Sequence, residues 1–511
     1  MFKLNLLCIY ICLYSSHVCE AYKALVVFPF PAKSHSILGD GVVRHLLDAG
    51  HEVTYFTTYP KALKVHPSLR EIDISSQHAY KLDVQGLLPL AKLFMQVQVR
   101  FLENETVKKL LNDPSEQFDV VILEWMFLEL TSGISAVFNC PYIWVSTLDP
   151  HWMVLKLIDE VPNPAYNADA QSVNIIPFTF IQRTTELLTM TFIINLVKYL
   201  IYSYIFGNEH REFERLLAPF IRKRGYNVPD FEELRYNASL ILGNSHVSMG
   251  QAIRLPQNYI PVGGYHINDN VNPLPEDIKK LLDNDKNGVI YFSMGSNLQS
   301  NNLPAEIKAS LLKMFAKLKQ TIIWKFEEDL PNRPSNVHII KWAPQQSILA
   351  HPNCVLFITH GGLLSTTEAI HFGKPVIGIP VFADQFNNVD RYVSRGFAQR
   401  VDLSYTMADE LEMAIKEVLT NPRYIIKAKA LSFIYHDRPV SPGKELAHWV
   451  EHVVRTGGAP HLRSPALTVP WYQKCYMDLA VCITVILYSI VFVIKKLIGS
   501  VSKKQQKTKL Q

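Results

Sequence analysis

Short β-rich segments alternate with helical segments along most of the chain, and this alternation limits the possible folds more than any other feature of the sequence. Residues 24–28 and 52–56 are β-rich runs, and residues 36–49 between them carry apolar side chains at helical spacing. Gly50 is expected to end the intervening helix. A strand, a helix and a second strand in this order predict a βαβ unit, with which a parallel sheet begins.

The alternation runs through two series. In the first series, further strands are predicted at 118–123 and 141–146. The second series begins near residue 240, with strands expected at 239–243, 288–293, 321–325, 337–341, 355–359 and 375–379 and helices at 304–318 and 364–371. The Pro-, Asn- and Asp-rich stretch 268–287 interrupts this pattern and is expected to connect two domains.

We therefore predict an α/β protein with two doubly wound, Rossmann-like domains, at residues 22–240 and 241–460. The chain of 511 residues is long enough for two large cores, and its apolar content of 48% excludes a disordered or fibrous protein. Ligands of such sheets bind beyond the carboxyl ends of the strands, so the chemistry is expected in a cleft between the two domains.

Both ends of the chain indicate targeting. Lys3 and the apolar run 4–13 predict a secretory signal peptide at residues 1–21. Residues 479–494 are sixteen residues without a charge, and they predict a transmembrane helix at 479–498. The tail 499–511 then lies in the cytoplasm by the positive-inside rule, and the body is lumenal. These features predict a type I membrane protein with one span.

Charge and short motifs refine this location. Six lysines and no acid lie within residues 495–511, so the tail accounts for the net charge of +5 and a nucleic-acid partner is not expected. Lys507 and Lys509 match the dilysine signal for retrieval to the endoplasmic reticulum. Asn104 and Asn237 open glycosylation sequons that a lumenal body makes usable.

One further apolar segment, residues 187–206, has two interpretations. It contains Asn195 and Lys198 among apolar residues, so it predicts either a buried or acceptor-lining helix or a helix on a membrane surface. The former is the commoner outcome for such a segment.

The window from Trp342 to Gln385 carries most of the candidate chemistry. A strand there ends at Thr359, and glycines followed by a helix allow close approach of backbone N–H groups to a phosphate. Polar and aromatic side chains around this turn are suited to a nucleotide: His360 as a donor, Trp342 as a flat surface for a base, Gln345 as a paired donor and acceptor, Ser365 and Glu368 on the helix, and Asp384 and Gln385 for sugar hydroxyls.

This window, WAPQQSILAHPNCVLFITHGGLLSTTEAIHFGKPVIGIPVFADQ, resembles the signature of the UDP-glycosyltransferase family, which includes glucuronosyl- and glucosyltransferases. The segments FSMGS, RPVSPGKELAHWVEHV and GAPHLRSPALTVPWYQ and the single C-terminal span are similar to the animal, especially insect, membrane-bound branch. The resemblance implies the GT-B fold and a UDP-sugar site. In that site Trp342 stacks on uracil, Gln345 and Glu368 hold the nucleoside, Ser293, His360, Gly361 and Gly362 face the diphosphate, and Asp384 and Gln385 face the sugar. Many relatives have Asn where this chain has Leu364.

The first domain is expected to supply a general base. His35 lies in the first strand-to-helix loop, and an imidazole there can take a proton from an attacking alcohol or phenol. A carboxylate should orient that ring. The family places an Asp after the strand matching 118–123, where this chain has Glu124, and Glu129 is the alternative.

No metal site or cofactor is expected. Asp283 and Asp285 match the DxD pattern of metal-dependent glycosyltransferases, but they lie in a polar stretch that predicts a solvated turn. No CxxC or Cys/His cluster indicates zinc. A helix N-terminus and His360 are expected to stabilise the leaving diphosphate instead.

The resulting hypothesis is an inverting, metal-independent transfer of a hexose, with UDP-glucose favoured as the co-substrate, to small lipophilic acceptors of the kind met in detoxification. The alternative is a catalytically silent relative that binds UDP-sugar or lipophiles. The acceptor's identity and the oligomeric state are left open by the sequence.

Overall fold

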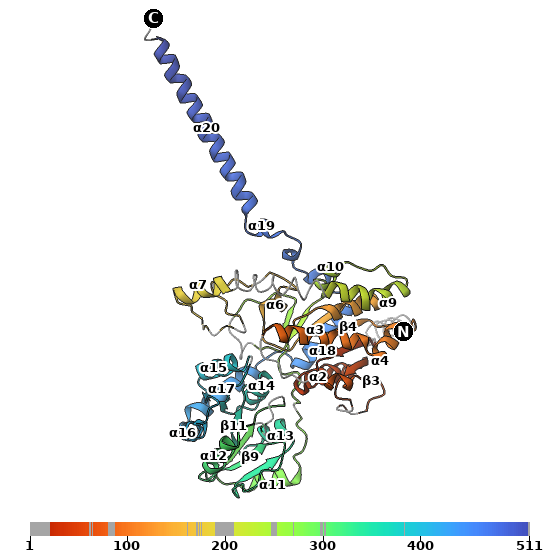
Figure 1. The fold of residues 1–511 in the computed structure, drawn as a ribbon, viewed down its shortest axis with the longest axis vertical. Coiled ribbons are helices and arrows are strands. Elements are labelled where there is room, and N and C mark those ends of the chain that lie inside the picture. The colour runs from red at the N-terminus through yellow and green to blue at the C-terminus, as the bar shows by residue number, and fades with distance from the viewer. Residues whose placement is uncertain are drawn as a thin grey trace, which may run out of the picture. The chain divides into compact units, whose positions relative to one another are not determined.

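The computed structural model describes residues 21–508, apart from residues 61, 62, 64, 80–86, 161, 170, 171, 173, 175, 190–208, 247–252, 269, 297–299, 301, 302 and 383. The chain forms two compact units that divide between Leu462 and Arg463. The first unit, called the body here, contains both sheets (Figure 1).

The first half of the body is built on a parallel sheet in the order β3-β2-β1-β4-β5-β6-β7. Its strands are β1 (Lys23–Phe28), β2 (Glu52–Thr57), β3 (Leu69–Asp73), β4 (Val120–Trp125), β5 (Tyr142–Ser146), β6 (Ile241–Gly243) and β7 (Tyr259–Pro261). Strand β4 is buried along its whole length, as is typical of a parallel strand covered on both faces. The strand order reverses between β1 and β4, and ligands of such sheets bind at that point.

Helices cover this sheet. They are α2 (Lys33–Asp48), α3 (Leu87–Glu103), α4 (Glu105–Asn112), α5 (Gly133–Phe138), α6 (Trp152–Leu155), α7 (Phe180–Leu188), α9 (Ala218–Lys223) and α10 (Phe231–Arg235). Helix α2 ends as predicted, because Gly50 has a φ of +90° and a helix cannot continue through that conformation.

The second half repeats the design in the order β10-β9-β8-β11-β12-β13, again with parallel pairing. Its strands are β8 (Val289–Ser293), β9 (Thr321–Lys325), β10 (Val337–Ile340), β11 (Cys354–Thr359), β12 (Val376–Gly378) and β13 (Ala398–Arg400). The order reverses between β8 and β11, so this half also has a switch point.

The helices of the second half enclose a hydrophobic core on each face of its sheet. They are α11 (Glu276–Asn284), α12 (Ala305–Phe315), α13 (Gln345–Ala350), α14 (Leu363–His371), α15 (Gln385–Ser394), α16 (Met407–Thr420) and α17 (Arg423–His436). The two doubly wound series predicted from the sequence are therefore both present.

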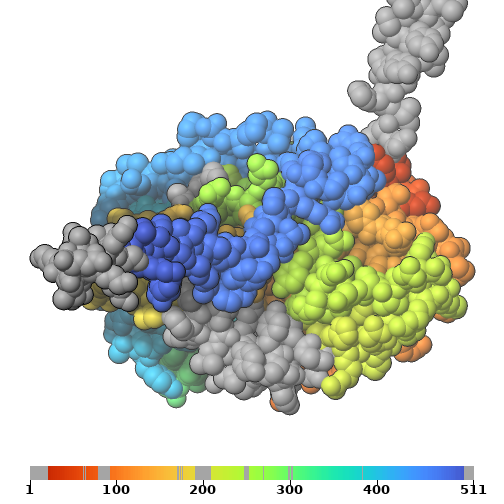
Figure 2. Space-filling view, turned by 90° about the horizontal axis from the view of Figure 1, so that it is seen from above, coloured from red at the N-terminus to blue at the C-terminus, as the bar shows by residue number. Residues whose placement is uncertain are grey.

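The last helix of the body, α18 (Pro442–Arg455), returns to the first half. Leu446, Val450 and Val453 of α18 are buried in the same cluster as Leu38 and Val42 of α2. Figure 1 shows α18 beside α2, and in Figure 2 blue residues lie next to the red and orange ones at the surface. The chain therefore crosses between the halves twice.

Three sequence-based expectations need correction. The strand predicted at 239–243 to open the second series is β6, which pairs with β5 in the first sheet, so the boundary predicted at 240/241 falls inside that sheet. The strand predicted at 118–123 runs from Val120 to Trp125, so Glu124 lies within it. The stretch 268–287 contains the helix α11, whose polar outer face hid it among turn-forming residues.

The second unit contains α19 (Trp471–Lys474) and α20 (Met477–Thr508). Among the described residues, Met477–Gly499 is the helical stretch long and apolar enough to cross a membrane. It includes the predicted span 479–498. Lys509 and the signal peptide predicted at 1–21, except Ala21, lie outside the described residues, as does most of the segment 187–206.

Candidate active site

His35 and Glu124 meet at the switch point of the first sheet. His35 lies in the first turn of α2, directly after β1, and Glu124 lies near the end of the adjacent β4. The Nδ1 atom of His35 is hydrogen-bonded to Glu124 Oε1, and Glu124 Oε2 accepts from Phe30 N at 3.3 Å. Glu124 is 2% exposed. This contact directs the Nδ1 side of the ring into the protein and leaves Nε2 for a substrate.

Glu129, the alternative partner for His35, belongs to a different cluster. Its carboxylate is paired with Arg235 and accepts from Trp125 Nε1 at 3.1 Å, and its backbone N–H donates to Glu209 Oε1 at 2.6 Å. Burial, and then the charge of Glu129, raise the pKa of Glu209 to about 8. Glu129 therefore takes part in a buried ionic cluster, and the structure brings Glu124 to His35.

Apolar side chains surround the base. The ring centroid of Phe30 lies 4.7 Å from that of His35 and 5.8 Å from that of Phe94. Phe94 in turn stacks on Phe127 at 5.2 Å. Phe30, Phe94 and Leu128 belong to one small buried cluster, so the base lies beside packed aromatic side chains.

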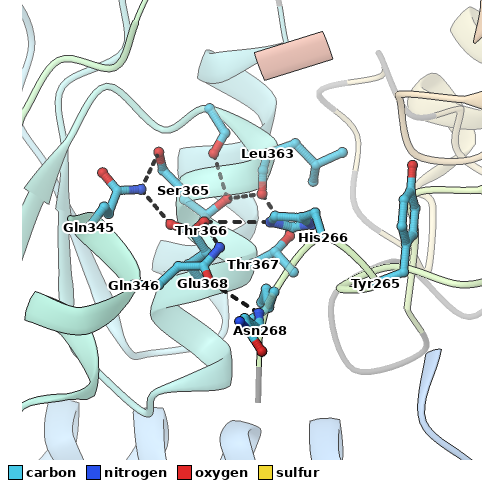
Figure 3. A network of polar contacts seen from close by, with 12 residues as sticks. Tyr265, His266, Asn268, Gln345, Gln346, Leu363, Ser365, Thr366, Thr367 and Glu368 are labelled. Carbon is cyan, nitrogen blue, oxygen red and sulfur yellow. Dashed lines mark hydrogen bonds and ion pairs between the residues drawn. The ribbon is translucent and has the colours of Figure 1, made fainter. Parts of the chain in front are cut away.

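Glu368 is the centre of a polar network in the second half (Figure 3). Gln345 Nε2 donates to Glu368 Oε2 at 2.5 Å and to Ser365 Oγ at 3.2 Å, and Gln346 Nε2 donates to Glu368 Oε1 at 3.0 Å. Tyr291 OH donates to Gln345 Oε1 at 3.2 Å, which fixes the orientation of that amide. The network joins the predicted Gln345, Ser365 and Glu368.

His266 connects this network to the crossing segment that follows β7. Its Nε2 lies 3.6 Å from Glu368 Oε1, and the neighbouring Asn268 N donates to Gln346 Oε1 at 3.1 Å (Figure 3). Neither residue belongs to a sequence motif, because the segment that brings them here is far from the signature window in the chain.

The glycine turns of the second sheet enclose the ring of His360. A Cβ atom on Gly295 would lie 2.4 Å from His360 Cε1, and one on Gly362 would lie 2.5 Å from His360 Nε2. Both residues must therefore be glycine for the ring to occupy its position. Gly295 and Gly361 also have a φ of +83°, which favours glycine. Gly362 is the N-cap of α14, so the positive end of that helix faces the same place.

Lys325 adds a cation that the motifs do not include. It is the last residue of β9, and its strand partner is Ser293 at the end of β8. Its Nζ donates to Gly295 O at 2.8 Å and lies 5.8 Å from the centroid of the Trp342 ring. Burial and the charge of Lys325 lower the pKa of His360 to about 4. At neutral pH His360 is thus uncharged. The position of Lys325 at the end of a predicted strand is the only signal in the sequence.

Trp342 is accessible, as a stacking surface requires. Its side chain is 57% exposed, although it is a large aromatic residue. It precedes the helix α13, which carries Gln345 at its first position. An exposed indole beside an ordered polar network is suited to hold a planar base.

The predicted sugar-binding pair lies at the start of α15. Asp384 Oδ2 accepts from Asn388 Nδ2 at 2.8 Å, and the same nitrogen donates to Gly361 O at 3.2 Å. Gln385 Oε1 accepts from Val381 N at 2.9 Å and so closes the loop before the helix. Burial raises the pKa of Asp384, while the charges of its neighbours, including His35, act in the opposite direction. The pair is therefore tied to the glycine turn and within electrostatic range of the base.

Leu364 has an apolar environment of its own. It lies in the first turn of α14 and packs against the buried cluster that contains α2 and α18. The side chain that replaces the Asn of many relatives therefore faces the first half of the body.

The carboxylates of the DxD pattern are engaged in local structure. Asp283 lies in the last turn of α11 and interacts with Lys279 and with His351 Nε2 at 3.0 Å, and Asp285 Oδ2 accepts from Thr321 N at 2.7 Å. Within the described parts of the chain, no group of three or more His, Cys, Asp or Glu side chains is arranged to hold a metal ion.

The two sequons differ in environment. Asn237 is exposed in the loop after α10. Asn104 is partly buried and caps α4, because its side chain accepts from Thr106 N at 2.9 Å.

Comparisons with known proteins assign nearly the whole chain to one family. Residues 24–510 match the family model described as UDP-glucoronosyl and UDP-glucosyl transferase. The chain is 33% identical to UDP-glycosyltransferase UGT5 of Dactylopius coccus over 498 residues, which cover 93% of this chain and 91% of that protein. It is 35% identical to UDP-glucuronosyltransferase 2B1 of Rattus norvegicus over 250 residues, which cover 48% of this chain and 47% of that protein.

Solved structures show the same architecture. The structure of Arabidopsis thaliana UGT89C1 complexed with UDP-L-rhamnose matches with a TM-score of 0.57 and 17% identity, covering 85% of this chain and 100% of that one. The glycotransferase of kitacinnamycin matches with a TM-score of 0.58 and 17% identity, covering 85% and 99%. The GT-B fold predicted from the sequence is confirmed, and the chain belongs to the UDP-glycosyltransferase family, whose members transfer a sugar from a UDP-sugar.

Proposed function

We propose that this glycosyltransferase transfers glucose from UDP-glucose to a hydroxyl group of small lipophilic molecules, with inversion at the anomeric carbon and His35 as the general base. The observation that carries the proposal is the buried contact between His35 and Glu124 at the switch point of the first sheet. A base held in this way needs a donor site opposite, and the network around Glu368 and the turn at His360 supplies one.

The proposed reaction is a single displacement. Glu124 accepts from Nδ1 of His35, so Nε2 is the nitrogen that takes the proton of the acceptor hydroxyl. The acceptor oxygen bonds to the anomeric carbon as the bond from that carbon to the diphosphate oxygen breaks, and the electron pair leaves with UDP. Attack on the face opposite the diphosphate converts an α-linked donor into a β-glycoside.

Charge on the departing diphosphate is proposed to be stabilised without a metal ion. Lys325, whose Nζ is also paired with Glu327 at 2.7 Å, supplies a buried cation, and the N-terminus of α14 supplies backbone donors and the positive end of a helix dipole. His360, whose pKa is lowered to about 4, acts as a neutral hydrogen-bond donor. Removal of divalent ions with EDTA is therefore expected to leave turnover unchanged.

The nucleoside is assigned to the network around Glu368. Trp342 stacks on uracil, Gln345 contacts the nucleoside, and Glu368 accepts from ribose hydroxyls with the lone pairs that Gln345 and Gln346 leave.

Two observations support glucose as the sugar. Asp149 is a buried acid whose pKa is raised by burial and by the charge of Asp384, so a glucuronate carboxylate there would add a third negative charge. A second relative, 29% identical over 505 residues, is named UDP-glucosyltransferase 2 of Dactylopius coccus. A neutral hexose suits this surface better than an acidic one.

A lipophilic acceptor follows from the aromatic cluster beside the base. Phe30 contacts His35, and Phe94 and Phe127 continue the apolar surface away from it. A phenol or a hydrophobic alcohol would bury its apolar part there and present its hydroxyl to Nε2.

The proposed location is the membrane of the endoplasmic reticulum, with the body in the lumen and α20 as the anchor. External protease on sealed microsomes should then remove only the tail, and glycosidase should shift the mass through Asn237 and Asn104. Digestion of the body from outside would refute this orientation.

The function is tested by mass spectrometry of products from microsomes that express the chain, supplied with a set of phenols and alcohols and with several UDP-sugars. We expect hexosides of the acceptors and release of UDP. In His35→Ala, turnover should fall by about 10²-fold or more, with UDP affinity unchanged. Binding of acceptors or UDP-glucose without any product would favour the silent alternative, and normal turnover in His35→Ala would require another base.

A further inference from the structure

A buried ion pair joins the two halves of the body next to the sugar-binding pair. Arg391 Nη1 donates to Asp149 Oδ2 at 2.9 Å, and the two side chains are 10% and 9% exposed. Arg391 belongs to α15 in the second half, and Asp149 follows β5 in the first half. Arg391 Nη2 also donates to Asp169 O at 3.4 Å, so the guanidinium contacts two segments of the first half.

Asp149 is connected through the first sheet to the proposed base, and Arg391 lies on the helix that carries the proposed sugar-binding pair. On the first half, Asp149 lies just beyond the end of β5, and β5 pairs with β4 so that Val145 is opposite Glu124. Glu124 in turn is the carboxylate that contacts His35. Asp149 is therefore joined to the proposed base by two neighbouring strands of one sheet.

On the second half, α15 carries the sugar pair and the arginine together. Asp384 is at the N-cap position of the helix and Arg391 follows seven residues later, which places both on the same helical face. Asn388 and Tyr392 attach the helix to its own half through Gly361 O at 3.2 Å and Thr366 Oγ1 at 2.9 Å. Arg391 is the residue of this helix that crosses to the other half.

Each charge of this pair is buried, so each is stabilised by the presence of the other. Asp149 Oδ1 is buried without a hydrogen-bond partner, so Arg391 supplies the side-chain hydrogen bond of this carboxylate, and the charge of Arg395 adds to its compensation. Burial raises the pKa of Asp149, and the charge of Arg391 opposes that shift. Removal of either partner would leave the other buried charge without its hydrogen-bonded counterion.

From these contacts we infer that Asp149 and Arg391 are positioning residues, a cross-domain pair that fixes the sugar-binding end of α15 at the correct distance from His35. In this proposal the pair binds neither UDP nor the acceptor. Its effect is on the alignment of the anomeric carbon with the acceptor oxygen, where an error of about 1 Å can cost about 10²-fold in rate. The inference rests on the proposed function, because it concerns the geometry of that transfer.

The test compares Asp149→Asn, Arg391→Gln and the double variant in the full chain. Each single variant should lower kcat about 10- to 100-fold and leave UDP affinity within about twofold, because the UDP contacts lie within the second half. The double variant should be no worse than either single one, since it removes both buried charges. Asp390→Asn is the matched control: this neighbour on α15 pairs with Arg400 at 2.8 Å inside the second half, and its loss should leave kcat unchanged.

Hydrogen exchange measured by mass spectrometry gives a readout that does not need turnover. Both single variants should exchange faster in two separate segments, residues 147–155 and α15, whereas Asp390→Asn should not affect the first segment. Unchanged exchange in 147–155, or a loss of UDP affinity equal to the loss of kcat, would overturn the cross-domain role. Absence of turnover in the unaltered chain would refute the proposed function, and the exchange result would still decide whether the pair couples the halves.

Discussion

The exchange of Glu124 for Gln is the sharpest test of the catalytic geometry, because Glu129→Gln provides a matched control five residues away. Both substitutions remove one buried negative charge and keep the shape of the side chain. Glu124 contacts His35, whereas Glu129 contacts Arg235. We therefore expect the first variant to lose activity and the second to lose stability.

The hydrogen bonds of Glu124 set the size of the first effect. Its two oxygens accept from His35 and from Phe30 N, but Gln has one oxygen only. If that oxygen stays on Phe30, the amide NH₂ faces His35 and favours the tautomer with a proton on Nε2, which cannot accept another. A hydrogen bond to a charged group contributes about 1.5–3 kcal/mol, or ten- to 150-fold in rate. The lost hydrogen bond and the unfavourable tautomer of His35 together should lower kcat by about 10²- to 10⁴-fold.

The cluster around Glu129 sets the second effect. Breaking a buried ion pair costs about 3–5 kcal/mol. We expect the low end of that range, because Arg235 retains Glu232 at 3.1 Å and Glu209 at 3.5 Å. Loss of the Glu129 charge should also lower the pKa of Glu209 from about 8, although burial, the larger cause of the raised pKa, remains. Turnover per folded molecule should stay close to that of the unaltered enzyme.

The assay measures UDP release, with the folded fraction determined by calorimetric titration with UDP and the stability by urea unfolding. A normal kcat in Glu124→Gln would refute the assignment of Glu124 as the partner of His35. So would a large loss of kcat in Glu129→Gln at unchanged stability.

Gly295→Ala should weaken UDP binding about tenfold, because the added Cβ would displace the His360 ring. Gly225→Ala is the control for backbone strain in the same titration, because Gly225 also has a positive φ, of +80°, but has open space around it. Trp342→Ala should weaken the binding of UDP and of UDP-glucose alike. Asp384→Asn should leave the affinity for UDP unchanged and weaken UDP-glucose binding by about ten- to 150-fold, both measured by calorimetry. If Asp384→Asn lost affinity for both ligands equally, Asp384 would be assigned to the diphosphate or to the fold. Burial and Lys325 lower the pKa of His360 from 6.5 to about 4, so its contribution to stability is present above pH 6.5 and is lost as the pH falls toward 4. Urea unfolding of His360→Gln should therefore show a smaller loss over that range than the unaltered chain, and identical pH profiles would contradict the lowered pKa.

Strands with a β-rich run could be predicted from the sequence, the three-residue β6 and β12 among them, whereas β3, β7 and β13 were not predicted. β8 and β9 lie within a residue of their predicted ranges. β6 and β7 have three residues each, so their membership of the first sheet depends on tertiary pairing that no local pattern encodes. The correction of the domain boundary follows from this.

The donor side of the site was accessible to sequence reasoning because its residues are close together in the chain. Gln345, Ser365 and Glu368 lie within one window and form one network. The partner of His35 was ambiguous, since two carboxylates follow the same strand and only the direction of each side chain separates them. Asp149 and Arg391 lie 242 residues apart, and neither has a motif that would connect them.

The return of α18 to the first half has a consequence for biosynthesis. The strands of that half are complete at Pro261, but the buried cluster that contains Leu38 and Val42 of α2 is complete only when α18 has been made. At about 5–20 residues per second, the roughly 200 residues from Pro261 to Leu462 take on the order of 10–40 s to synthesise. Throughout that interval this cluster lacks the apolar side chains that Leu446, Val450 and Val453 contribute. A ribosome-bound chain that stops before Pro442 should therefore remain associated with chaperones, and one that extends past Leu462 should be released from them.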